Sequence, residues 1–111
     1  MEKLYNNARK QSYVTFYKKG YIRLPARVRR TIEDKTGAVA TDIFIDKNNK
    51  QLILIPSNNG DYSLCADKSG MMVCVYAARD CGIELGKHNY TLVEEDNGLQ
   101  LKVDFKAIQS V

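Results

Sequence analysis

The chain has 111 residues, of which 44% are hydrophobic and 27% charged, and its net charge is +4. A chain of this length forms one ordinary domain or two very small ones, and its balance of residues is typical of a folded protein rather than a disordered one. The longest apolar stretch, 71–78, is far shorter than the roughly 20 residues of a membrane-spanning helix. Because the polar stretch 1–12 also lacks the apolar core of a secretory signal, we expect a cytoplasmic protein.

The charge is unevenly distributed along the chain. Residues 1–60 contain 12 lysines and arginines against 5 acidic residues, a net charge of +7, whereas residues 61–111 contain 5 against 8, a net charge of −3. Such asymmetry favours a polyanion as the partner of the first half. A solvated basic surface without a partner explains the charge equally well when charge is considered alone.

The first elements in chain order are two predicted strands, 13–17 and 21–24, which are rich in β-branched and aromatic residues. Gly20 between them supplies the backbone freedom of a hairpin turn. Pro25 ends the second strand and suits the first turn of a helix over 26–35, in which two apolar residues lie four positions apart on one face. A second hairpin follows, with predicted strands over 41–46 and 51–55 around a polar turn.

The second half repeats this order of elements. Its predicted strands are 62–66, 71–75, 90–95 and 99–104, with a short helix near 76–81. Three groups of residues match between the halves, at offsets of 50, 48 and 47: Lys18, Gly20 and Arg29 with Lys68, Gly70 and Arg79; 43–45 with 91–93; and Leu52 and Leu54 with Leu99 and Leu101. The offset changes where loops are expected, since loops tolerate insertions.

These matches predict a tandem repeat of one hairpin–helix–hairpin unit. The first unit is 13–56 and is basic, the second is 62–105 and is acidic and diverged, and 1–12 is a basic N-terminal arm. Because one such unit cannot cover both faces of its own hairpins, we expect the two units to close into one body, a mainly β protein with short helices that forms a pseudo-symmetric β-barrel. The alternating pattern predicts these buried side chains: Ile22, Leu24, Val28, Ile43, Ile45, Leu52, Leu54, Met72, Cys74, Val93, Leu99 and Leu101.

The stretch from Gly20 to Ile32, with Leu24-Pro25 and Arg29-Arg30, resembles the AbrB family of swapped-hairpin transcription factors. The apolar strands 43–45 and 52–55 with an acidic turn residue between them continue the resemblance, which covers about nine tenths of the chain and is strongest in the first unit. The tandem arrangement is similar to the MraZ branch of that family. The resemblance implies a swapped-hairpin barrel, duplex DNA binding and transcriptional regulation, with Arg29 and Arg30 at the positions of the family's DNA-contacting helix arginines.

The chain departs from the family pattern in both units. Tyr21 stands where an arginine is frequent, and the second unit has Val75, Ala77 and Asp80 where the first has Pro25, Arg27 and Arg30. We therefore expect the first unit, and not the second, to contact DNA.

Six basic residues are the predicted nucleic-acid contacts: Lys18, Lys19, Arg23, Arg27, Arg29 and Arg30. Such cations neutralise phosphates, and arginine also reads guanine through its two-pronged donor group. For Arg29 the alternative to a DNA contact is a structural salt bridge, because the less basic second unit keeps an arginine, Arg79, at the equivalent position. Tyr17 and Tyr21 flank the basic turn and either stack on bases or pack within the sheet.

Catalytic and metal chemistry find little support in the sequence. His88 is expected in a loop without a partner, and no phosphate-binding loop or nucleophile motif is present. The three cysteines, Cys65, Cys74 and Cys81, have no standard zinc spacing. We therefore expect neither an enzyme nor a cofactor.

The partner is expected to be duplex DNA, and the chain itself is expected to be a monomer or a homodimer. The alternative is a protein-interaction module on the same scaffold, antitoxin-like or directed at a host regulatory protein, with the partner on the second unit. A DNA binder should lose affinity steeply with salt, and a protein binder should not.

Overall fold

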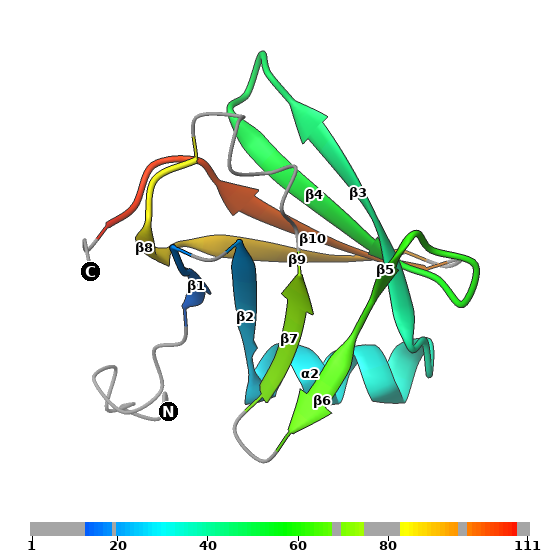
Figure 1. Ribbon diagram of the computed structural model, residues 1–111. Helices are drawn as coiled ribbons and strands as arrows, with labels where there is room; N and C mark the ends of the chain where they lie inside the picture. Colours follow the sequence, from blue (N-terminus) through cyan, green and yellow to red (C-terminus); the bar gives the residue numbers. More distant parts are fainter. Residues whose placement is uncertain (1–12, 19, 68–69, 75–82, 96–97, 109–111) are drawn as a thin grey trace, which may run out of the picture.

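The protein is mainly β in a computed structural model, which describes residues 13–18, 20–67, 70–74, 83–95 and 98–108. Its elements are β1 (Val14–Phe16), β2 (Tyr21–Pro25), α2 (Ala26–Lys35), β3 (Ala40–Asp46), β4 (Gln51–Pro56), β5 (Tyr62–Ser63), β6 (Cys65–Asp67), β7 (Gly70–Cys74), β8 (Gly86–His88), β9 (Tyr90–Glu95) and β10 (Gly98–Asp104). The strands form two five-stranded antiparallel sheets, ordered β6-β7-β2-β1-β8 and β5-β3-β4-β10-β9 (Figure 1). The prediction of a mainly β protein with a short helix is confirmed, and the second predicted helix, 76–81, lies outside the described residues.

The turn between β1 and β2 forms where the sequence predicts it. Gly20 adopts a φ of 87° there, a backbone conformation that side-chain-bearing residues rarely reach. Its N–H donates to the Tyr17 carbonyl at 3.0 Å, and the Tyr17 N–H donates to the Tyr21 carbonyl at 2.9 Å. These two bonds close the hairpin and set the alternation of the following strand.

Helix α2 begins directly after β2, and its bounds agree with the predicted 26–35. Pro25 at its start has an extended backbone and cannot continue a helix toward the N-terminus. Val28 and Ile32 form its buried face, which packs against β7 and β2 (Figure 1). At its other end, the Ile32 carbonyl accepts from the backbone N–H groups of Thr36 and Gly37 at 2.9 Å each and from the Thr36 hydroxyl at 2.8 Å.

The central strand pair of each sheet joins the first half of the chain to the second. In one sheet β2 pairs with β7, with Arg23 opposite Met72 and Ile22 opposite Val73. In the other sheet β4 pairs with β10, with Leu54 opposite Leu101. The core lies between the sheets, and both halves of the chain contribute to it.

The predicted strand 62–66 is two strands. β5 pairs with β3, and β6 pairs with β7 in the other sheet, so the chain crosses between the sheets at Leu64. This side chain is buried, and its N–H donates to the Val39 carbonyl at 2.9 Å. An apolar residue at the crossing point lets the chain pass over the core while its backbone donor stays satisfied.

Most of the predicted core side chains are buried, and the exception in β7 follows from the strand register. Ile22, Leu24, Val28, Leu52, Leu54, Leu99 and Leu101 are buried as predicted. Ile43 and Val93 are half-buried, and Ile45 is 37% exposed. The side chain of Cys74 lies outside the part of the chain that the structure describes. In β7, Val73 is buried and Met72 is half-buried, which reverses the predicted alternation. A shift of one residue in strand register moves every side chain to the other face.

The expectation of a loop around His88 is wrong. His88 ends β8, where it lies opposite Val14 of β1, and its side chain is fully buried. Its ring lies near Phe16, with 4.7 Å between the ring centroids. Each ring nitrogen faces a carbonyl oxygen, Nδ1 that of Asp104 at 2.5 Å and Nε2 that of Glu84 at 2.7 Å, and the tautomer decides which nitrogen donates.

Candidate nucleic-acid interface

The structure describes five of the six predicted contact residues, and Lys19 lies outside the described residues. Lys18 is exposed in the turn that precedes β2, and Arg23 is in the middle of β2. Arg23 alternates with the buried Ile22 and Leu24, so its side chain lies on the outer face of the sheet. Arg27 and Arg30 are exposed on α2.

Lys18 and Arg23 line one hollow of about 440 Å³ on the outer face of the sheet. Tyr17, Tyr21 and Met72 complete its lining. Tyr17 is 40% exposed, so it is a surface residue rather than part of the core. The hollow therefore combines cationic groups with aromatic rings, the combination that contacts phosphates and stacks on bases or sugars. The sequence singled out four of these five residues.

Met72 is the member of the hollow that sequence reasoning missed. It comes from β7, roughly fifty positions away in the chain, and lies opposite Arg23 in the pairing of β2 with β7. No local signal identifies it, because only the pairing of the two strands brings it there.

Arg27 and Arg30 lie in the first half of α2, three positions apart and away from the buried face of Val28 and Ile32. The first turn of this helix contains no acidic residue, and Pro25 at its start gives no side-chain cap. The amino end of a helix carries a partial positive charge, which adds to that of the arginines. The result is a local excess of positive charge.

Arg29 has a different environment from its two neighbours. Its Nε lies 3.2 Å from Oε1 of Glu33, one turn later in α2, and its side chain is only 23% exposed. This geometry supports the alternative of a structural salt bridge. The residue that occupies its place in the second unit, Arg79, lies outside the described residues.

The predicted residues form two groups rather than one cluster. Lys18 precedes β2, and Arg27 follows its last residue, Pro25. The four residue steps of this strand, at about 3.3 Å each, place about 13 Å of extended chain between Lys18 and Arg27. β2 therefore links a turn group, formed by the hollow, to a helix group, formed by Arg27 and Arg30.

Other kinds of site have little basis in the described parts of the chain. No helix there is long and apolar enough to cross a membrane. No three of its histidine, cysteine and acidic side chains are grouped so that they could hold a metal ion. Cys65 is an exposed free thiol.

No protein-family model, no curated protein and no solved structure matches the chain. Its function is therefore inferred from its own residues and their geometry.

Proposed function

We propose that this protein is a cytoplasmic DNA-binding transcriptional regulator without enzymatic activity, and that it contacts duplex DNA through the turn group and the helix group of its first half. The observation that carries the proposal is the placement of Arg27, exposed in the positively charged first turn of α2, with Arg30 exposed three positions later.

This placement works against the stability of the helix. A cation near the amino end of a helix costs about 0.3–1 kcal/mol, because it is repelled by the helix dipole. No described carboxylate forms an ion pair with Arg27 or Arg30 that would offset this cost. Phosphate groups of DNA would remove the repulsion and release the counterions that surround the nucleic acid. A polyanionic partner that binds these arginines would therefore explain why the helix carries them.

The spacing of the two groups also suits a duplex. The length of β2 between Lys18 and Arg27, about 13 Å, is close to the width of the major groove, about 12 Å. The helix group and Lys18 can then contact phosphates on the two sides of one groove, with Arg23 between them. Tyr17 and Tyr21 are placed in the hollow to pack on sugars or bases.

We further propose that the scaffold is the AbrB-type swapped-hairpin barrel, built from repeats 13–56 and 62–105 and present as a monomer or a homodimer. The pairing of equivalent strands supports this. β2 and β7 occupy matching places in the two repeats and lie side by side, as do β4 and β10. Leu54 and Leu101, separated by the offset of 47 found in the sequence, lie directly opposite each other, as a pseudo-two-fold axis requires. β5 and β8 are extra strands at two sheet edges.

A protein-interaction module on the same scaffold is the second candidate. Apolar side chains on the surface favour it, since Phe44 is 53% exposed on β3 and Val39 is exposed just before that strand. Its interface would rest on apolar contacts, so the affinity would change little with salt, in contrast to a DNA complex.

The test compares two variants that remove the same charge. Arg27→Ala combined with Arg30→Ala removes the helix group, and Lys87→Ala combined with Lys102→Ala removes two cations from other strands. Binding to a library of random duplex fragments is measured at two salt concentrations, and folding is checked by thermal unfolding. We expect the first variant to stay folded, to bind much more weakly and to lose about two units of salt slope, whereas the second resembles the parent. Equal duplex binding by the folded arginine variant and the parent would refute the proposal and leave the protein-partner alternative.

A further inference from the structure

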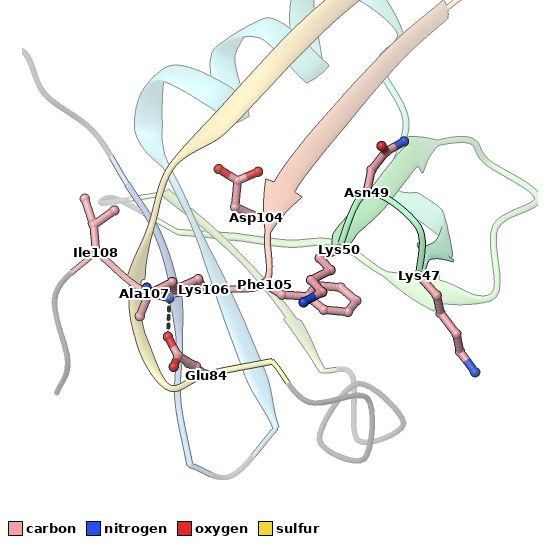
Figure 2. A pocket seen from close by; sticks show the side chains of 9 residues that line it. All are labelled: Lys47, Asn49, Lys50, Glu84, Asp104, Phe105, Lys106, Ala107 and Ile108. Atoms are coloured by element: carbon pink, nitrogen blue, oxygen red, sulfur yellow. Dashed lines mark hydrogen bonds between the residues drawn. The ribbon is translucent and has the colours of Figure 1, made fainter.

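A second hollow, of about 970 Å³, lies where three distant segments of the chain meet (Figure 2). Lys47, Asn49 and Lys50 come from the turn between β3 and β4, and Glu84 precedes β8. The third segment is the end of β10 and the residues after it, 104–108. This hollow shares no residue with the turn group or the helix group, and its volume is near the upper end of the range for small-molecule sites.

Hydrogen bonds hold the walls of this hollow in place. The Phe105 N–H donates to the Lys50 carbonyl at 2.9 Å, and the Glu84 N–H donates to the Phe105 carbonyl at 3.1 Å. The buried ring of His88 lies between the carbonyl oxygens of Glu84 and Asp104, so it ties two wall segments together from behind. A site with fixed walls binds a ligand without the entropic cost of ordering them.

The carboxylates of the hollow are already engaged by the protein. The Ala107 N–H donates to Oε1 of Glu84 at 2.7 Å, a bond drawn in Figure 2. The Gln51 side-chain amide donates to Oδ1 of Asp104 at 3.1 Å.

The lysines of the hollow have no such partners. Within the described parts of the chain, Lys47, Lys50 and Lys106 form no ion pair, and all three are exposed. The lining therefore carries three lysines against two carboxylates, a net charge of +1, which favours an anionic ligand. Apolar surface lies beside them, because Phe105 is half-buried against the core, and Ile108 is 49% exposed.

Lys50 stands at a position that its residue type disfavours. Its φ is 53°, in the left-handed region where glycine and asparagine are more stable than other residues. Strained backbone of this kind is found preferentially at binding and catalytic sites. A binding role for the ammonium group, which glycine lacks, would explain why a lysine occupies this position.

We propose that this hollow is a binding site for a small organic anion with an apolar body, a carboxylate or a phosphate monoester. The anionic group is held by Lys50 with Lys47 and Lys106, and the apolar body packs on Phe105 and Ile108. Neither a bare inorganic anion nor a neutral apolar molecule satisfies both halves of the lining.

The test uses matched probes of defined chemistry. 3-Phenylpropionate, its neutral amide, phenyl phosphate and inorganic phosphate are titrated separately into the ¹⁵N-labelled full chain, and amide resonances are followed by NMR. We expect 3-phenylpropionate, phenyl phosphate or both to shift the amides of Lys50 and of 105–108. The amide and inorganic phosphate are expected to bind about tenfold more weakly, since each lacks half of the recognition. Comparison of the affinities for 3-phenylpropionate and phenyl phosphate shows whether the site prefers a carboxylate or a phosphate.

The variant Lys50→Gly separates ligand binding from folding. Glycine relieves the left-handed backbone, so the unfolding temperature should not fall, while affinity for the organic anion should drop about tenfold. Lys102→Ala removes one positive charge outside the hollow and should bind like the parent. Equal binding of the acid and its amide, equal binding of inorganic phosphate and the organic anions, or unchanged binding by Lys50→Gly would overturn the proposal. So would the absence of any shift at these amides with both organic anions at millimolar concentration.

Discussion

The replacement of His88 by leucine tests how the end of the chain is attached to the sheets. The side chain is fully buried at the edge of the first sheet, and its ring nitrogens lie 2.5 Å and 2.7 Å from the carbonyl oxygens of Asp104 and Glu84. Leucine has a similar volume and fills the same space, but it cannot donate a hydrogen bond. The substitution therefore removes the hydrogen bonds and the contact with the Phe16 ring while the space stays filled.

The expected loss of stability follows from these contacts. A partly buried carbonyl that loses its donor costs about 1–3 kcal/mol, and the tautomer of the ring decides which carbonyl receives its N–H. The contact with the Phe16 ring contributes about 0.5–1.5 kcal/mol, while the more apolar leucine recovers about 1 kcal/mol by burial. The net decrease in the free energy of unfolding is about 2 kcal/mol. For a chain of this size that lowers the unfolding temperature by about 10 °C.

Urea unfolding followed by circular dichroism measures this loss. Asn89→Ala is the matched control, because its side chain is exposed one position further along and its carbonyl bond to the Asp104 N–H is retained. The control should stay within about 0.5 kcal/mol of the parent. A His88→Leu protein within about 1 kcal/mol of the parent would show that these two carbonyls do not depend on the histidine.

Two further predictions concern the turns. A Cβ atom at Gly60 would lie 2.3 Å from the Thr41 backbone, so Gly60→Ala should lower the free energy of unfolding by about 1–3 kcal/mol, whereas Gly98→Ala, which meets no atom, should leave it nearly unchanged. Similar urea midpoints for both variants would contradict this. Hydrogen bonds from the Asn49 backbone and side chain lower the pKa of Asp46. A lowered carboxyl pKa stabilises the folded protein at a pH above the pKa that Asp46 has in the unfolded chain. The stabilisation is lost as the pH falls through the pKa of Asp46 in the folded protein. Asn49→Ala removes the side-chain bond and keeps the backbone donor, so it should raise the pKa of Asp46 part of the way in an NMR titration, and an unchanged pKa would exclude the side-chain bond as a cause.

The sequence by itself predicted the local elements of the first half. Gly20 marks the turn between β1 and β2, Pro25 marks the boundary between β2 and α2, and the spacing of Val28 and Ile32 defines the buried face of the helix. These features are local, because backbone geometry and side-chain periodicity act over a few residues. The candidate interface could be identified to the same extent, since its cations follow one another along a single strand and helix.

Only the tertiary structure decided how the second half is used. The run 71–75 is apolar at nearly every position, so its sequence does not say which residues face the core. Pairing with β2 placed Val73 opposite Ile22 and turned Met72 outward beside Arg23. His88 likewise lies in a strand because its segment pairs with β1. The lysines of the second hollow lie together because segments distant in the sequence contact one another. Strand register and partner choice depend on cross-strand packing between residues far apart in the chain, which a local pattern does not contain.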